Sequence, residues 1–337
     1  MCKLLINKLS KFTIALSAIS ATTFANADIL TSVRPLGFIA SSIADGITET
    51  QVLIPAGASP HDYSMKPSDA KRVRDAEFVL WIGKDIDAFL EKSIAQRDTT
   101  SVLTISKLAG IESLLGETSA HDHDHDHDHD HDHDHDHDHD HDHDHDHDHD
   151  HDHDHDHDHH HSTNELEQDW HVWFSPKISE QVAEQLAQQL TQLYPQHQAK
   201  IATNLETFKQ QLTTTNQQIT QQLAEFKDQG FYVFHDAYRY FENAYGLQQT
   251  GYFTINPLIA PGAKKLAKIK EEINEHKVKC LFAEPQFTPK VLQTLQQSTN
   301  VKIGQLDPMG EKIALGKGSY SAFLQQIAED FSDCLKN

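Results

Sequence analysis

Residues 28–54 read DILTSVRPLGFIASSIADGITETQVLI, and this stretch indicates the fold. It holds a β-rich run at 29–33, a helical run at 35–47 and a second β-rich run at 50–54. A short strand, a helix and another short strand form a βαβ unit, and such units build parallel sheets. The opening of the chain therefore predicts an α/β fold.

The same alternation continues outward from this stretch and then recurs near the end of the chain. Helical patterns lie at 68–76 and 86–95, around a β-rich run at 78–82. Two similar α/β lobes are expected, because the pattern resumes after a long interval. The second set comprises strands at 231–234, 278–283 and 301–305, and helices at 264–275, at 289–297 and from 319 onward.

Two helices are expected between these sets. Ser175 and Pro176 form a helix start, with serine as the cap and proline in the first helical position, and this helix runs toward Leu193. Apolar residues then recur three, four or seven positions apart from 201 to 226, which predicts one helix about 45 Å long. Its narrow apolar stripe is typical of a strut between lobes, rather than of a helix within one core.

The amino terminus has the pattern of a signal peptide. Three lysines before residue 12 precede an apolar stretch at 12–24, and Ala25-Asn26-Ala27 supplies a cleavage pattern. We expect cleavage before Asp28 and a soluble, exported chain, because the apolar stretch is too short to span a membrane. The alternative is an ordinary amphipathic first helix. Cys2 would leave with this leader and has no lipobox before it, so a lipid anchor is not expected.

The segment from His121 to His161 is a nearly perfect His-Asp repeat of 22 histidines and 19 aspartates, here named the His-Asp tract. The tract carries most of the formal charge of −23, and the rest of the chain is close to neutral. Binding to nucleic acid is excluded, because the chain has no basic stripe and a polyanion repels phosphate. The tract should remain disordered, because it has no apolar residue to offset the ordering entropy. Its composition points to metal chemistry, and its imidazoles are expected to bind zinc at low affinity.

Three of the five histidines outside the tract are expected at the ends of secondary-structure elements. His61 follows the strand at 50–54 through a Pro/Gly turn, and His235 comes directly after the strand at 231–234. Ligands bind at this carboxyl edge of parallel sheets. His171 precedes the helix start at Ser175, so all three can meet in one cleft.

Three neutral imidazoles suit Zn(II) and leave a fourth tetrahedral position for water or a carboxylate. A single histidine in such a place is more commonly a loop or core residue, but three in an exported chain with a His-Asp tract favour a metal site. Asp307, after the strand at 301–305, is a candidate fourth ligand; the alternative is a turn-forming aspartate. His197 and His276 lie in helical patterns with polar neighbours and are interpreted as surface residues.

Cys280 and Cys334 remain after removal of the leader. Two cysteines in an oxidising compartment commonly form a bridge, and closing a loop of this size contributes roughly 4 kcal/mol. The alternative, a thiolate metal pair, needs close spacing such as C-x-x-C, which these residues lack. A structural disulfide between them is therefore predicted.

Several motifs resemble the ZnuA family, the periplasmic zinc-binding components of bacterial ABC importers. The resemblance covers the mature chain apart from the tract. The motifs are Gly57-Ala58-Ser59-Pro60-His61-Asp62-Tyr63, Pro67-Ser68-Asp69, Asp169-Trp170-His171, Phe234-His235-Asp236-Ala237-Tyr238, Ala283-Glu284-Pro285-Gln286 and Leu306-Asp307-Pro308.

The resemblance implies the cluster A-I solute-binding fold, with two four-stranded parallel sheets flanked by helices and joined by one long helix. The implied organisation is a signal peptide (1–27), an N-terminal lobe (28–194), an inter-lobe helix (195–228) and a C-terminal lobe (229–337). The implied zinc ligands are His61, His171 and His235. Some relatives carry an acidic residue just before the first histidine, where this chain has Pro60.

Three function classes follow. The first is a monomeric periplasmic protein that captures Zn(II) and delivers it to an inner-membrane ABC permease, with periplasmic zinc chaperones as candidate partners. In that case the tract either collects zinc at low affinity or is a solvated insertion. The second is a zinc hydrolase, disfavoured because no H-E-x-x-H pattern is present. The third is a zinc store or sensor in which the tract is the functional part. The first is expected, so the protein is not expected to be an enzyme.

Overall fold

The computed structural model describes residues 28–116, 168–254, 261–275, 277–285 and 290–336. Three predictions concern residues outside these ranges: the signal peptide, the disordered zinc-collecting tract from His121 to His161, and the surface position of His276. The structure therefore does not test the low-affinity zinc sites expected in the tract, and they stay a prediction. Within the described ranges, no helix combines the length and the apolar character needed to cross a membrane.

The first sheet has four parallel strands in the order β2-β1-β3-β4. The central strand β1 pairs with β2 and β3, so that Ile29 lies opposite Thr50 on one side and Phe78 on the other. Every residue of β3 is buried, as expected for a strand covered on both faces. The strands are β1 (Asp28–Thr31), β2 (Glu49–Val52), β3 (Phe78–Trp81) and β4 (Val102–Thr104), and the helices around them are α1 (Arg34–Ile43), α2 (Pro67–Asp75) and α3 (Glu91–Ile94).

The second sheet repeats this topology, with four parallel strands in the order β6-β5-β7-β8. The prediction of two similar α/β halves is therefore confirmed. The strands are β5 (Phe231–His235), β6 (Gly251–Thr254), β7 (Cys280–Ala283) and β8 (Lys302–Gln305), and the accompanying helices are α6 (Arg239–Tyr245), α7 (Ala263–Asn274) and α8 (Lys290–Thr299).

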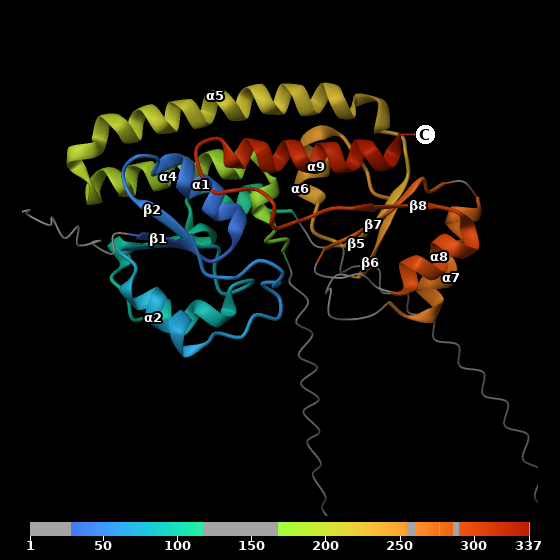
Figure 1. Ribbon diagram of the computed structural model, residues 1–337, viewed down its shortest axis with the longest axis horizontal. Coiled ribbons are helices and arrows are strands. Elements are labelled where there is room, and N and C mark those ends of the chain that lie inside the picture. The colour runs from blue at the N-terminus through green and yellow to red at the C-terminus, as the bar shows by residue number, and fades with distance from the viewer. Residues whose placement is uncertain (1–27, 117–167, 255–260, 276, 286–289, 337) are drawn as a thin grey trace, which may run out of the picture.

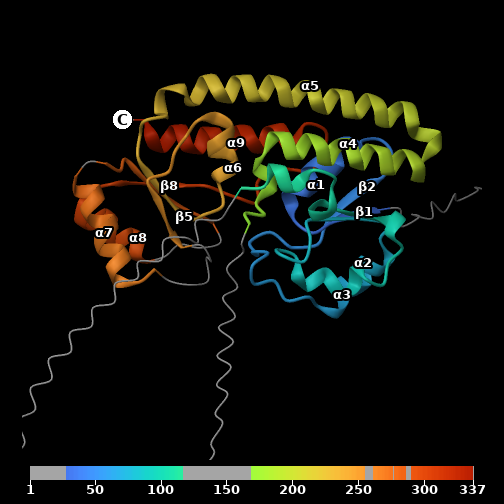
Figure 2. The same cartoon turned by 180° about the vertical axis from the view of Figure 1, so that it is seen from behind.

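Three long helices lie along one side of both sheets (Figure 1 and, from behind, Figure 2): α4 (Pro176–Leu193), α5 (Gln198–Leu223) and α9 (Ser319–Leu335). Helix α4 begins as predicted, with the Ser175 hydroxyl accepting from the Ile178 backbone N–H at 3.3 Å. Helix α5 spans 26 residues, as the apolar spacing predicts. It is the longest helix in the described ranges.

The interpretation of α5 as a strut outside the core is wrong. Its buried residues belong to the same hydrophobic cluster as the buried faces of α1, α4 and α9. Phe208 of α5, for example, packs against Tyr320 of α9 with ring centroids 5.6 Å apart. A narrow stripe is enough to bury α5, because α4 lies beneath one half of the helix and α9 beneath the other half (Figure 1).

After β8, residues 306–318, here named the crossing segment, return to the first lobe before α9 begins (Figure 1). Arg34 anchors this segment by donating from Nε to the Gly310 carbonyl at 3.2 Å. Gly310 has a φ of 62°, and a side chain there would collide with Phe38 and Phe323. Helix α9 therefore starts against the first lobe and ends at the second.

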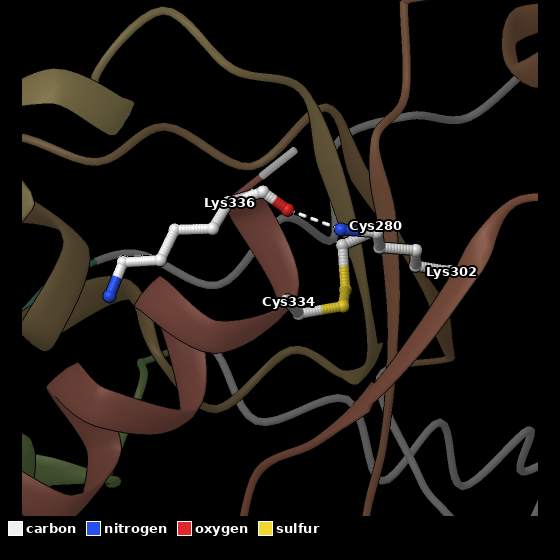
Figure 3. Close-up of a disulfide and its surroundings, with 4 residues drawn as sticks. All are labelled: Cys280, Lys302, Cys334 and Lys336. Atoms are coloured by element: carbon white, nitrogen blue, oxygen red, sulfur yellow. Dashed lines mark hydrogen bonds between the residues drawn. A yellow bond between two sulfur atoms is a disulfide. The ribbon is translucent and has the colours of Figure 1, made fainter.

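The predicted disulfide is present and joins β7 to the last turn of α9 (Figure 3). The Cα atoms of Cys280 and Cys334 are 5.9 Å apart, within the usual range. On the neighbouring strand β8, Lys302 donates from its side chain to the Lys336 carbonyl (Figure 3). The end of α9 is thus fixed to the second sheet by a covalent bond and a hydrogen bond.

Candidate metal centre

The structure brings the three predicted histidines together between the two sheets. His61 lies on the loop after β2, His171 precedes the 3₁₀ helix Val172–Phe174, and His235 is the last residue of β5. One ring nitrogen from each lies within 4.8 Å of the other two. A divalent ion placed among them could reach all three imidazoles.

The loop that carries His61 depends on glycine at its tightest point. Gly57 has a φ of 80°, which is strained for residues with a side chain. Ser59 then accepts from the His61 backbone N–H at 3.3 Å through its hydroxyl. These contacts direct the histidine back over the sheet edge.

The three imidazoles differ in their exposure and in their contacts. His171 and His235 are 4% and 3% exposed, whereas His61 is only partly buried. The Nε2 atoms of His61 and His171 are 3.2 Å apart. Nε2 of His235 is buried and has no hydrogen-bond partner among the described residues. A metal ion would satisfy this nitrogen, which is otherwise costly to bury.

A buried carboxylate fixes the orientation of His171. Oδ1 of Asp169 accepts from the His171 backbone N–H at 2.9 Å and contacts its ring Nδ1 at 2.7 Å. If Nδ1 carries the proton, the lone pair of Nε2 is directed toward the other two histidines. Such a carboxylate behind a ligating histidine commonly sets its tautomer and strengthens metal binding.

A second buried carboxylate, that of Glu284, lies behind His235. Its Oε1 lies 3.5 Å from the His235 Nδ1 and accepts from the Tyr238 hydroxyl at 3.2 Å. Glu284 was not predicted as a site residue, although it lies in one of the motifs shared with the ZnuA family. One signal could have found it: Glu284 directly follows the buried strand β7, at the same sheet edge as His235.

The electrostatics of the site favour a neutral imidazole at His61. Burial, together with the nearby His235 and His171, lowers the pKa of His61 well below its usual value of 6.5. A proton on His61 would lose solvation and face two neighbours that can also be protonated. The His61 lone pair is therefore available to a metal even in mild acid.

The structure does not bring Asp307 to the three histidines. Its carboxylate accepts from the backbone N–H groups of Met309 and Gly310 at 3.0 Å and of Glu311 at 2.7 Å. Burial raises the pKa of Asp307, and these backbone bonds act in the opposite direction. Asp307 is thus outside the group of ligand atoms that lie within 4.8 Å of one another, and its hydrogen bonds match the turn-forming alternative.

The turn formed by Asp307 shapes one wall of the pocket. Trp173 closes another wall and donates from Nε1 to the Pro308 carbonyl at 3.1 Å. The space among these residues is about 20 Å³, enough for an ion or a water molecule. His197, in the 3₁₀ helix Pro195–His197, is partly exposed and does not line it. The lining residues are Ser59, Pro60, His61, His171, Trp173, His235, Glu284, Pro308 and Met309.

Two similar α/β lobes with an imidazole cluster between their sheets define a solute-binding protein with a site suited to a metal ion. The sequence model of the ZnuA family, described as "Zinc-uptake complex component A periplasmic", matches residues 29–334, and the chain belongs to this family.

Curated relatives support the assignment. The chain is 60% identical over 326 residues to the high-affinity zinc uptake system protein ZnuA of Haemophilus influenzae, covering 96% of this chain and 97% of the relative. Identity to the ZnuA protein of Haemophilus ducreyi is 54% over 325 residues, covering 96% and 98%.

Solved structures have the same fold. A crystal structure of ZnuA matches with a TM-score of 0.69 at 20% identity, covering 92% of this chain and 99% of the other. The periplasmic zinc-binding protein TroA from Treponema pallidum matches with a TM-score of 0.68 at 17% identity, with the same coverage.

Proposed function

We propose that this protein captures Zn(II) with His61, His171 and His235 and delivers it to the permease of an ABC importer. The supporting observation is the convergence of three ring nitrogens within 4.8 Å. The names of the curated relatives, which describe high-affinity zinc uptake, agree with this proposal. Water completes the tetrahedral coordination, because only the three imidazoles offer ligand atoms within 4.8 Å of one another among the described residues.

Binding rather than catalysis is proposed because of the size of the pocket. A zinc hydrolase needs space for an organic substrate beside the metal and its water. The pocket among the histidines has about 20 Å³, and Trp173, Pro308 and Met309 form its walls. This space suits an ion and its bound water, and the family to which the chain belongs is a zinc-uptake family.

The chain organisation proposed from the sequence is retained. Residues 1–27 are removed on export, and the mature monomer acts in the periplasm. The lobes comprise residues 28–194 and 229–337, and residues 195–228 connect them. The His-Asp tract, from His121 to His161, collects zinc at low affinity, and its tethering raises the zinc concentration near the cleft.

Competitive zinc titration tests the proposal. The protein without residues 1–27 and 121–161 is compared with its His61→Ala, His171→Ala and His235→Ala variants, and His197→Ala is the matched control. One tight site, weakened strongly by each of the three substitutions and unchanged by the control, is expected. Loss of all tight binding on deletion of the tract would instead support a zinc store whose functional part is the repeat.

A further inference from the structure

We propose that Tyr240 is a positioning residue for the zinc ligand His171. It acts through Asp169, across the boundary between the lobes. The inference rests on the proposed function and concerns how one ligand is held. Tyr240 lies on α6 of the second lobe, whereas His171 belongs to the segment that leads into α4.

Three hydrogen bonds connect Tyr240, Gly116 and Asp169, and two of them involve the Tyr240 hydroxyl. The Tyr240 hydroxyl donates to the Asp169 carbonyl at 2.6 Å and accepts from the Gly116 backbone N–H at 2.9 Å. Asp169 in turn donates from its backbone N–H to the Gly116 carbonyl at 3.0 Å. Each of the three residues thus contacts the other two, and we name this arrangement the Tyr240 clamp.

The Tyr240 clamp is connected directly to the metal centre. Asp169, whose backbone it holds, is the residue whose carboxylate accepts from the backbone and ring of His171. Asp169 and Tyr240 are 2% and 8% exposed, so water cannot readily replace a lost bond. Movement of the Asp169 backbone would therefore change the direction of the His171 ring.

A second contact from the same part of the chain supports this role. Tyr238, two residues before Tyr240, packs on Phe174 with ring centroids 5.0 Å apart, and Phe174 ends the 3₁₀ helix that follows His171. Tyr238 also donates to Glu284, the carboxylate behind His235. Residues 238–240 thus contact the supports of both buried histidines.

The clamp also joins the described residues on either side of positions 117–167. Gly116 and Asp169 are bonded to each other, and the Tyr240 hydroxyl bonds to both. Because the described ends are joined there, changes in tract length should leave the His171 geometry intact. Tract deletion and Tyr240 substitution should therefore differ in their effect on the tight site.

The test compares Tyr240→Phe with Tyr245→Phe in the full mature protein. Tyr245 is a matched control, because it lies on the same helix, is buried, and donates to Asn216 Oδ1 at 2.6 Å, outside the pocket lining. Zinc affinity is measured against a chelator strong enough to keep the tract free of metal. Tyr240→Phe should weaken zinc binding about tenfold, as for loss of an outer partner of a ligand, whereas Tyr245→Phe should change it less than about twofold.

Two further readouts separate positioning from general stability. The visible spectrum of bound Co(II) should change in Tyr240→Phe and not in Tyr245→Phe, although both variants lose a buried hydrogen bond. In a protein that already carries Asp169→Ala, Tyr240→Phe should lower the zinc affinity less than it does in the wild type, because its effect passes through Asp169.

The outcomes are distinct. Equal zinc affinity and Co(II) spectra for Tyr240→Phe and wild type would overturn the inference and leave the proposed function intact. Additive effects of Tyr240→Phe and Asp169→Ala would also overturn it. Absence of tight zinc binding in the wild type would reject the proposed function itself.

Discussion

The Nε2 atoms of His61 and His171 lie 3.2 Å apart, although the two residues are 110 positions apart in the chain. The contact forms because the loop after β2 and the segment before α4 meet at the sheet edge. His171 is buried and held by Asp169, whereas His61 is partly exposed. The centre therefore combines firmly held ligands with a more accessible one.

Zinc stoichiometry should depend on pH while occupancy of the cleft does not. The pKa of His61 is lowered well below 6.5, so the cleft imidazole stays neutral in mild acid. Tract histidines with the reference pKa of about 6.5 become protonated there, and protons compete with zinc. Titration of the mature protein should show several zinc ions bound at about pH 7.5 and a number near one at about pH 5.5. Equal stoichiometry at both values would contradict this prediction.

Glu311→Ala should accelerate zinc release. Oε1 of Glu311, on the crossing segment, accepts from the Gly57 backbone N–H at 2.5 Å and so restrains the loop that carries His61. The contact is exposed, and its loss should cost about 1 kcal/mol, or roughly fivefold in rate. Stopped-flow transfer of zinc to a chelator measures the rate. Glu329→Ala, an exposed change on α9, is the control, and equal rates for both variants would exclude a role for this contact.

Removal of the disulfide should destabilise the protein. Replacing both Cys280 and Cys334 by serine releases the end of α9 from β7, and the expected loss is about 4 kcal/mol of unfolding free energy. Urea unfolding of the oxidised wild type and the double variant measures the difference. If the unfolding free energy falls by less than about 1 kcal/mol, packing of α9 alone holds its end against β7.

Glu242→Gln should remove part of the pH dependence of stability. Burial raises the pKa of Glu242 to about 8 from a usual 4.5, so the folded protein binds this proton more tightly than the unfolded chain. This contribution is complete below pH 4.5 and is lost as the pH rises through about 8.

The wild-type melting temperature should accordingly fall between about pH 6 and about pH 9 by more than that of Glu242→Gln. Calorimetry over this range provides the measurement. Glu206→Gln, an exposed change on α5, serves as the control. If the melting temperatures of wild type and Glu242→Gln fall equally with pH, the raised pKa of Glu242 does not contribute to the pH dependence of stability.

Much of the fold could be predicted because strands and helices alternate clearly from residue 28 onward. Strands β4 and β6 and helix α6 were not located from the sequence, because their three, four and seven residues show little apolar periodicity. The packing of α5 was predicted incorrectly. A stripe pattern gives the width of an apolar face, but not the number of helices that cover it.

The candidate site was predictable where a residue's place in an element determined its surroundings. His61 and His235 follow strands, and parallel strands direct their carboxyl ends to one edge. Asp307 also follows a strand, yet the local turn uses its oxygens. Tyr240 was missed as a site residue, because its role depends on contacts between segments distant in sequence. Glu284 was missed although it directly follows a strand.

Helix α9 has a consequence for how the protein acquires its structure. Its first turns pack against Phe38 and Trp173 of the first lobe, and its last turn is bonded to the second sheet. Residues of both lobes and of α9 belong to one hydrophobic cluster, so the core of each lobe is incomplete until α9 is in place. Because the cleft lies between the two lobes, its three histidines reach their final positions only after segments from both ends of the described chain have packed together.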